Sequence, residues 1–144
     1  MPHGGVNVKY LIAEDDPNLR FLWHTLLTRH GHDVTETSSA DQARAALEED
    51  VFDVMLLDLY LGRASGFSLV RLAERLNPGC KVIIVAGAAE LSDREIRTSA
   101  RSVVSVHRKP VDIEDLLDVC GRIDRGSPLR RRVDLDRSEA IPPS

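Results

Sequence analysis

Five short apolar runs alternate with segments of helical periodicity along most of the chain, and this alternation limits the possible folds more than any other feature. The runs are Val8–Ala13, Asp33–Glu36, Asp53–Leu57, Lys81–Val85 and Val103–Val106. Strands that alternate with helices pair in parallel, because each helix supplies the long crossover that parallel neighbours need. The alternation therefore predicts a parallel sheet covered by helices.

The segments between the runs carry helix signals. Four leucines and a tryptophan stand at positions 19, 22, 23, 26 and 27. This spacing places them on one apolar stripe of an amphipathic helix. Asp16 followed by Pro17 predicts the start of this helix, and Gly31 predicts its end. Ser39 and Ser92 each stand three residues before a Gln or Glu, the pattern of a capping box at a helix start.

The strand–helix pattern fills residues 8–124, and the two ends of the chain differ from it. Residues 1–7 form a short N-terminal extension. Residues 125–144 hold arginines, prolines and serines without apolar periodicity, and so short a segment cannot form a core. We expect one α/β domain at 8–124, built on an open, doubly wound parallel sheet, and a flexible C-terminal tail.

The charge balance excludes some classes of partner. The net charge is −4, made up of −6 in residues 1–124 and +2 in the tail. An acidic body lacks the basic face that attracts nucleic acids and anionic membranes. The longest apolar stretch, Val82–Ala89, is far shorter than the ~18 residues of a membrane span. The start of the chain resembles no secretory signal, and Cys80 and Cys120 fit no disulfide framework. We expect a cytoplasmic protein that binds neither nucleic acid nor membrane.

Charged residues gather where the predicted strands end. The strand ends carry, in chain order, Glu14 with Asp15, Asp58, Ala86-Gly87 and Lys109. In a doubly wound sheet these ends share one edge, so we expect the side chains to converge there. Two carboxylates ~4 Å apart repel by ~4 kcal/mol at an effective dielectric of about 20, so the cluster needs positive charge beyond one lysine. Mg²⁺, which prefers oxygen ligands, fits this need. Asp58 is then equipped to attack a phosphoryl group and form an acyl phosphate.

On three motifs the chain resembles the receiver domain of two-component response regulators, of the stand-alone type. The motifs are Tyr10–Pro17, Asp53–Leu59 with Gly66 eight residues beyond Asp58, and Lys109-Pro110. They span nearly the whole predicted domain in the right order and spacing. The resemblance implies a flavodoxin-like sheet of five parallel strands in the order 2-1-3-4-5, flanked by five helices.

The resemblance also implies a role for each residue at the strand ends. Asp58 is the phosphoacceptor, and Lys109 and the Gly87 N–H contact the phosphoryl group. The ligands of Mg²⁺ are Glu14, Asp15, Asp58 and the backbone carbonyl of Tyr60. In the family the bond between Lys109 and Pro110 is often cis.

The implied function is phosphorelay signalling. A histidine kinase or phosphotransfer protein donates the phosphoryl group. The output passes to another protein through the surface formed by the fourth helix, the fifth strand and the fifth helix. The protein is then no enzyme but a phosphoacceptor that assists its own phosphorylation and dephosphorylation. A homodimer is left open.

Three positions depart from the family pattern. Ala86 stands where the family has a Ser or Thr whose hydroxyl binds the phosphoryl group, and Val106 stands where a Tyr or Phe swings inward on activation. Gly62 stands where a Pro is common. Losing the hydroxyl removes one charge-assisted hydrogen bond, about 1.5–3 kcal/mol. We expect a weaker or differently wired switch, and we expect the Tyr60 ring either to shield the acyl phosphate from water or merely to cover the loop.

Two other functions stay open at this point. Ala86 and Val106 also fit a degenerate receiver that acts as an interaction module without phosphate. A Mg²⁺-dependent phosphohydrolase also proceeds through an aspartyl phosphate, but such enzymes carry a second Asp two residues beyond the nucleophile, where this chain has Tyr60. A dinucleotide-binding domain is excluded, because no G-x-G-x-x-G follows the first strand.

Overall fold

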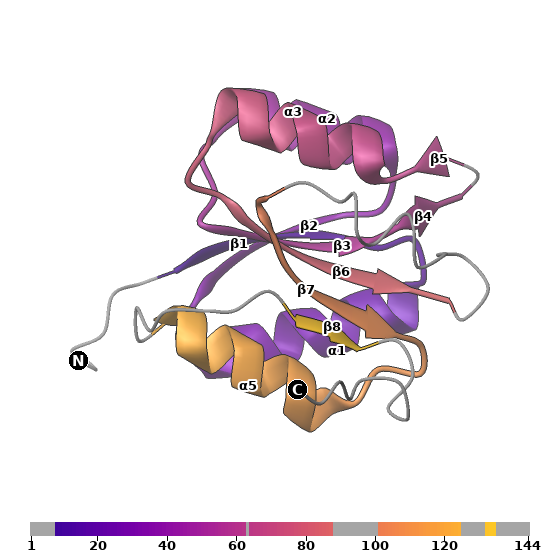
Figure 1. Cartoon of the computed structure of the whole chain (residues 1–144), viewed down its shortest axis with the longest axis vertical. Helices are drawn as coiled ribbons and strands as arrows, with labels where there is room; N and C mark the ends of the chain where they lie inside the picture. Colours follow the sequence, from indigo (N-terminus) through magenta and orange to yellow (C-terminus); the bar gives the residue numbers. More distant parts are fainter. Residues whose placement is uncertain (1–7, 63, 88–100, 125–131, 135–144) are drawn as a thin grey trace, which may run out of the picture.

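A six-stranded parallel sheet lies at the centre of the computed structural model, with helices on both faces (Figure 1). The structure describes residues 8–62, 64–87, 101–124 and 132–134. The strands of this sheet are Lys9–Ala13 (β1), Asp33–Thr37 (β2), Val54–Asp58 (β3), Lys81–Ala86 (β6), Val103–Arg108 (β7) and Arg132–Asp134 (β8). A separate antiparallel hairpin joins Tyr60–Leu61 (β4) to Ala64–Ser65 (β5). The helices are Pro17–Arg29 (α1), Ala40–Glu49 (α2), Phe67–Leu76 (α3) and Ile113–Asp124 (α5).

The order of the strands agrees with the predicted topology. The sheet runs β2-β1-β3-β6-β7-β8, and every neighbouring pair is parallel. Its first five members are the five predicted strands in the predicted order 2-1-3-4-5, with bounds shifted by only one or two residues. β3 is buried along its whole length, whereas β2 at the edge is largely exposed. The flavodoxin-like parallel sheet is confirmed.

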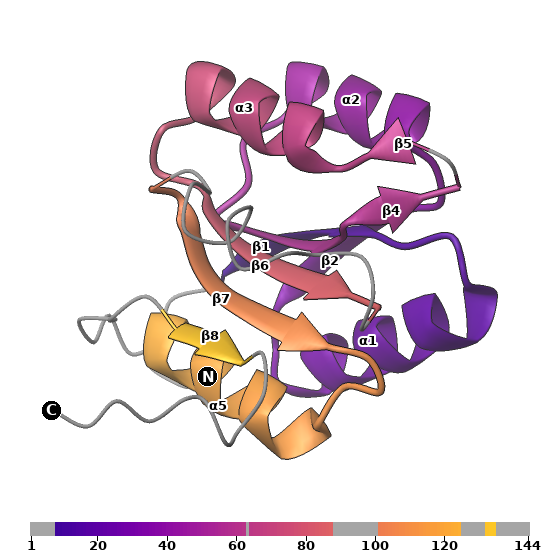
Figure 2. The ribbon, with the colours of Figure 1, turned by 45° about the vertical axis from the view of Figure 1, so that its right-hand side comes forward.

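A sixth strand, β8, was not predicted. It pairs in parallel with β7, from Ser105 opposite Arg132 to His107 opposite Asp134, and it lies alongside β7 next to α5 (Figure 2). These three residues were expected to belong to the flexible tail, because so short a segment shows no apolar periodicity. The strand forms because the outer edge of β7 offers unpaired backbone N–H and C=O groups to any extended segment within reach.

The helices cover the sheet in two layers (Figures 1 and 2). α2 and α3 pack on one face, and α1 and α5 pack on the other. Trp23, Leu27 and Leu116 fill the core beneath α1 and α5, and Leu47 and Leu69 fill the core beneath α2 and α3. Four of the five predicted helices are seen. The remaining one, between β6 and β7 with its capping box at Ser92, lies outside the described residues.

The sequence signals at the helix ends act as predicted. The Asp16 carboxylate accepts hydrogen bonds from the backbone N–H groups of Asn18 and Leu19 at the start of α1. Gly31 ends the helix with φ +84°, and its N–H donates to the Thr28 carbonyl. At α2 the Ser39 hydroxyl accepts from the N–H of Gln42, as a capping box requires.

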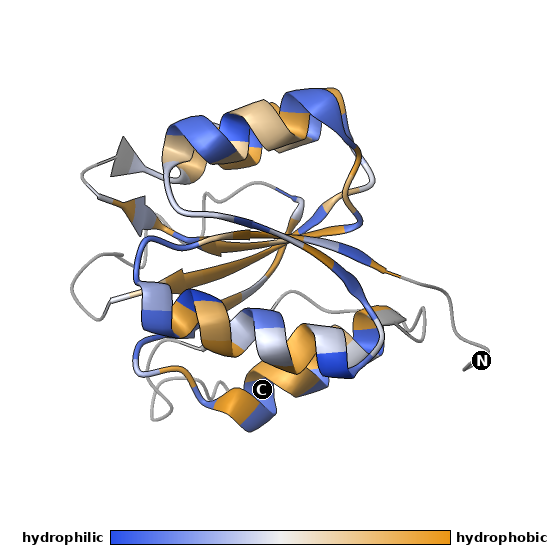
Figure 3. Cartoon of the chain, turned by 180° about the vertical axis from the view of Figure 1, so that it is seen from behind, coloured by the Kyte–Doolittle hydropathy of each residue, from blue (hydrophilic) through white to orange (hydrophobic). Residues whose placement is uncertain are grey.

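The hydropathy of the elements matches their positions. Most residues of the strands are hydrophobic, whereas the helices mix hydrophilic and hydrophobic residues along their length (Figure 3). Phe21 on α1 is a hydrophobic residue that does not face the core, because 69% of it is exposed. Among the described residues no helix has the length and apolar character needed to cross a membrane.

We predict that Gly31→Ala lowers the free energy of unfolding by about 1 kcal/mol, because an L-residue in the left-handed region is strained by roughly that amount. Urea denaturation of both proteins measures the difference. Gly31→Asn is the control, since Asn tolerates this conformation better and should lose less. Equal stability of all three proteins would show that Gly31 adds nothing to the end of α1.

Candidate functional site

Three carboxylates meet at the carboxyl ends of β1 and β3. Glu14 directly follows β1 and Asp58 is the last residue of β3, and the two strands pair in register with Ala13 opposite Leu57. This register brings the two acids side by side. One carboxylate oxygen each from Glu14, Asp15 and Asp58 lies within 4.8 Å of the others. Glu14 and Asp58 are buried, with 0% and 2% of each residue exposed, whereas Asp15 is exposed.

Lys109 supplies a positive charge to this cluster from the end of β7. Its Nζ lies 3.1 Å from Asp58 Oδ2 and 3.8 Å from Glu14 Oε1. β6 lies between β3 and β7, so the lysine side chain reaches across the end of β6. The Lys109 N–H donates to the Ala86 carbonyl at 2.8 Å, which fixes the backbone at this end of β7. The bond between Lys109 and Pro110 is cis. Glu14, Asp15, Asp58 and Lys109, which were expected to converge at the strand ends, therefore lie close together.

Burial makes one carboxyl group of the cluster unusually basic. The pKa of Glu14 is raised from 4.5 to about 8, first by burial and then by the neighbouring Asp58 carboxylate. A hydrogen bond from the Asp16 N–H and the charge of Lys109 act in the opposite direction. Among the described residues no group donates a hydrogen bond to Glu14 Oε1. This buried oxygen therefore has capacity for another positive partner.

The donor set suits a hard divalent cation. All three side chains offer oxygen, and neither His nor Cys belongs to the cluster. Oxygen ligands select Mg²⁺ or Ca²⁺ over softer metals. The buried Glu14 Oε1 lies 3.8 Å from the Lys109 ammonium and accepts no hydrogen bond among the described residues, so the residues present fit such an ion.

A hairpin that sequence reasoning missed contacts two of the three acids. The β4–β5 hairpin follows Asp58 directly, and the Tyr60 N–H donates to Asp58 Oδ1 at 3.2 Å. At its turn, the Gly62 N–H donates to Asp15 Oδ2 at 3.0 Å. Gly62 has φ +65°. Its identity was a signal for this contact, because the Pro common at this position in the family has no N–H to donate.

Comparison with known proteins identifies the family. The profile of the response regulator receiver domain matches residues 10–120. The chain is a receiver domain of the response-regulator family. Response regulator receiver protein CpdR of Brucella abortus (strain 2308) is 27% identical over 110 residues, which cover 76% of this chain and 91% of CpdR. The DNA-binding transcriptional regulator NtrC of Bradyrhizobium sp. (strain RP501 Parasponia) is 26% identical over 122 residues, 85% of this chain but only 24% of NtrC.

Solved structures agree on the fold. A CheY-like response regulator receiver domain protein from Methanospirillum hungatei JF-1 superposes with a TM-score of 0.75 at 26% identity, covering 84% of this chain and 96% of that one. A response regulator protein from Burkholderia pseudomallei, crystallised with a phosphorylated aspartic acid, a calcium ion and citrate, gives a TM-score of 0.68 at 20% identity. That pair covers 85% of this chain and 76% of the other. This receiver domain therefore belongs to two-component signalling.

The receiver motif glycine, Gly66, is required by close packing. A Cβ on Gly66 would lie 2.9 Å from the Leu59 carbonyl oxygen and 3.1 Å from Leu57 Cδ2. The Gly66 N–H also donates to that Leu59 carbonyl. Any larger residue would push the hairpin away from the end of β3, and with it the backbone that contacts Asp58.

Two of the three departures from the receiver pattern lie on β6 and β7, and the third, Gly62, lies in the turn of the β4–β5 hairpin. Ala86 is fully buried as the last residue of β6, and its methyl group offers no donor. Val106 is buried in the core beneath α2 and α3. Sequence reasoning also missed Arg108, which pairs with Ala86 in the sheet and whose Nη1 donates to the Gly87 carbonyl at 3.3 Å. Its position beside Lys109 was the available signal.

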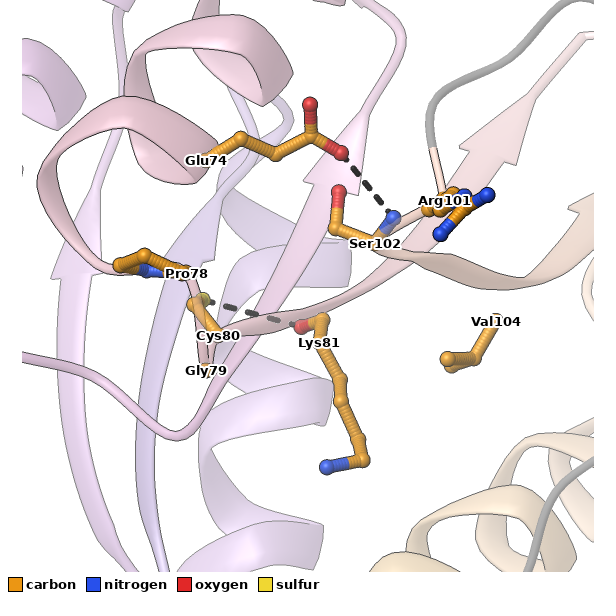
Figure 4. Close-up of a pocket in the computed structure, with 8 residues that line it drawn as sticks. All are labelled: Glu74, Pro78, Gly79, Cys80, Lys81, Arg101, Ser102 and Val104. Carbon is orange, nitrogen blue, oxygen red and sulfur yellow. Dashed lines mark hydrogen bonds between the residues drawn. The ribbon is translucent and has the colours of Figure 1, made fainter.

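The acid cluster is separate from a cavity at the opposite end of the sheet. That cavity, about 490 Å³, is lined by residues at the starts of β6 and β7, where Glu74 accepts a hydrogen bond from the Ser102 N–H (Figure 4). Cys80 belongs to its lining, and burial raises the pKa of this thiol to about 12. The thiol is therefore protonated and unreactive at neutral pH.

We predict that the free energy of unfolding of the metal-free protein falls as pH rises from 4.5 to about 8. The raised pKa of Glu14 means that the folded state holds a proton that the unfolded state releases across this range. The stabilisation is complete below pH 4.5 and is lost as pH rises through about 8. Urea denaturation in EDTA at several pH values measures it.

Glu14→Gln is the control for this pH dependence, because glutamine cannot titrate. The difference between the two curves gives the contribution that depends on Glu14, including its interactions with Asp58 and Lys109. Parallel curves from pH 5 to pH 9 would contradict a raised Glu14 pKa.

Proposed function

We propose that Asp58 accepts a phosphoryl group in a phosphorelay and that its modification is the signal this receiver carries. The observation that supports this most strongly is the position of its carboxylate. It lies at the carboxyl end of β3, 3.1 Å from the Lys109 ammonium and beside two further acids. A carboxylate held next to fixed positive charge is suited to phosphoryl transfer, where catalysis is mostly positioning and electrostatics.

The transfer is an in-line displacement. One Asp58 carboxylate oxygen attacks the phosphorus of a phosphohistidine on the donor protein. The new P–O bond forms as the P–N bond breaks, and its electron pair stays on the imidazole nitrogen of the donor. Lys109 moves from the Asp58 carboxylate onto an oxygen of the transferred phosphoryl group, and the Gly87 N–H donates to another. Later attack of water on phosphorus restores the carboxylate and releases inorganic phosphate.

A divalent cation belongs to this site, and we assign it to Mg²⁺. Glu14, Asp15, Asp58 and the backbone carbonyl of Tyr60 would hold it. When bound, it supplies positive charge for the phosphoryl oxygens. The buried Glu14 supports this assignment, because its pKa is raised and its Oε1, 3.8 Å from the Lys109 ammonium, accepts no hydrogen bond among the described residues.

The partners follow from this chemistry. A histidine kinase or a phosphotransfer protein donates the phosphoryl group, and the domain assists its own phosphorylation and dephosphorylation without turning over another substrate. The output passes to another protein through a surface that includes β7 and α5, with the predicted fourth helix completing it. We place the protein in the cytoplasm, where such donors present their phosphohistidine.

Ala86 and Val106 favour a second candidate function, a degenerate receiver that signals without phosphate. Ala86 lacks the hydroxyl that binds the phosphoryl group in the family, and Val106 lacks the aromatic ring that swings inward on activation. Ala86 is fully buried and Val106 is 1% exposed, so neither side chain has an alternative position at the surface.

The first experiment asks whether Asp58 is modified. With Mg²⁺ and phosphoramidate, which donates a phosphoryl group from nitrogen, we expect a mass increase of one phosphoryl group on the intact protein. Asp58→Asn should abolish the increase, and EDTA should suppress it. Asp53→Asn is the matched control at the other end of the same strand segment and should behave like the unsubstituted protein. No modification of folded protein would favour the degenerate receiver.

The second experiment concerns the hydroxyl missing at the end of β6. We predict that Ala86→Thr binds beryllium trifluoride, a phosphoryl mimic, about tenfold more tightly, because a hydrogen bond to a charged group contributes about 1.5–3 kcal/mol. Fluorine NMR titration in the presence of Mg²⁺ measures the affinity. Ala86→Val is the matched control, with the same shape and no hydroxyl. If Thr and Val behave alike, Ala86 has no effect on the phosphoryl group.

A further inference from the structure

The hydrogen bond between the hairpin turn and Asp15 connects two segments far apart in the sequence. Gly62 lies between β4 and β5, and its N–H donates to Asp15 Oδ2 at 3.0 Å. Asp15 follows Glu14 at the end of β1. The bond therefore connects the β4–β5 hairpin to the acid cluster.

Asp15 is the one exposed acid among the three, so it depends most on a fixed contact. Glu14 and Asp58 are buried, and their carboxylates also accept backbone N–H groups, from Asp16 and Tyr60 respectively. An exposed aspartate otherwise samples several rotamers, and ordering it opposes binding of a ligand. The Gly62 N–H contacts one oxygen of Asp15, and each carboxylate has further acceptor positions for another partner.

The contact depends on a glycine at position 62. Its φ of +65° is a conformation that other residues adopt with strain. Space is not the reason, since a Cβ on Gly62 would meet no atom within 4 Å. Proline could make no such bond, because it has no N–H and its φ is fixed near −65°.

We propose that Gly62 is a positioning residue that presets the Asp15 carboxylate for the divalent cation. This inference rests on the metal site of the proposed function. Hydrogen bonds to the carboxylates that ligate a metal fix their orientation, and their loss typically weakens metal affinity by about 10- to 100-fold. The cation and the hairpin are then coupled, so that metal binding stabilises the hairpin and hairpin strain weakens metal binding.

The test compares two glycines that share the same backbone feature. Among the described residues, Gly31 and Gly62 are the glycines with positive φ, and Gly31 lies at the far end of α1. Calorimetric titration with MgCl₂ gives the affinity of each variant. We expect Gly62→Ala to bind Mg²⁺ about tenfold more weakly, and Gly31→Ala to bind like the unsubstituted protein although it carries a similar strain.

Two further variants separate strain from loss of the donor. Gly62→Asn keeps the N–H and tolerates positive φ, so it should restore most of the affinity. An ester in place of the amide at residue 62, introduced with glycolic acid, removes the donor alone and should weaken Mg²⁺ binding as Gly62→Ala does. Unchanged affinity in the ester variant would overturn the proposal, whatever Gly62→Ala shows.

A readout without metal tests the contact by itself. In EDTA the Gly62 amide should exchange its hydrogen slowly, and Asp15→Ala should speed this exchange while leaving the Gly31 amide unchanged. Fast exchange in the unsubstituted protein would overturn the proposal even if Asp58 is phosphorylated. If the exchange is slow but no variant, substituted or not, binds Mg²⁺, the metal site of the proposed function fails instead.

Discussion

Two carboxylates buried side by side at the carboxyl ends of two inner strands are the constraint on which the rest of this structure depends. Glu14 and Asp58 end neighbouring parallel strands in register, and both are almost wholly buried. Burial and mutual repulsion both oppose ionisation, which explains why the pKa of Glu14 rises to about 8. Lys109 offsets part of this unfavourable energy at 3.1 Å from Asp58. Further positive charge at this site would therefore stabilise the ionised carboxylates.

The surrounding elements make this arrangement rigid. Gly66 lets the chain after the hairpin pass close to the end of β3, and the N–H groups of Tyr60 and Gly62 contact two of the acids. On the other side, Arg20 Nη1 donates to the Glu14 backbone carbonyl at 2.9 Å. Rigid placement suits phosphoryl transfer, because the protein contributes geometry and charge more than covalent chemistry.

Much of this could be predicted because it follows from local rules. Strands separated by helices must run in parallel, so the acids after β1 and β3 and the lysine after β7 had to share one edge. The parts that were missed depend on backbone rather than side-chain pattern. β8 forms on an open strand edge, and the β4–β5 hairpin contacts the acids through the backbone N–H groups of Tyr60 and Gly62. Arg108 was missed although it stands beside Lys109, because its contact is to the Gly87 backbone carbonyl, a group that every residue carries.

The central claim is that Asp58, Lys109 and the acid pair form one phosphoryl site, and a crystal structure grown with Mg²⁺ and beryllium trifluoride tests it most directly. The account predicts a trifluoride bonded to an Asp58 oxygen, Lys109 Nζ shifted from the Asp58 carboxylate to a fluorine, and a cation between Glu14, Asp15 and Asp58. A structure with the Lys109–Asp58 ion pair intact and no trifluoride on Asp58 would contradict it.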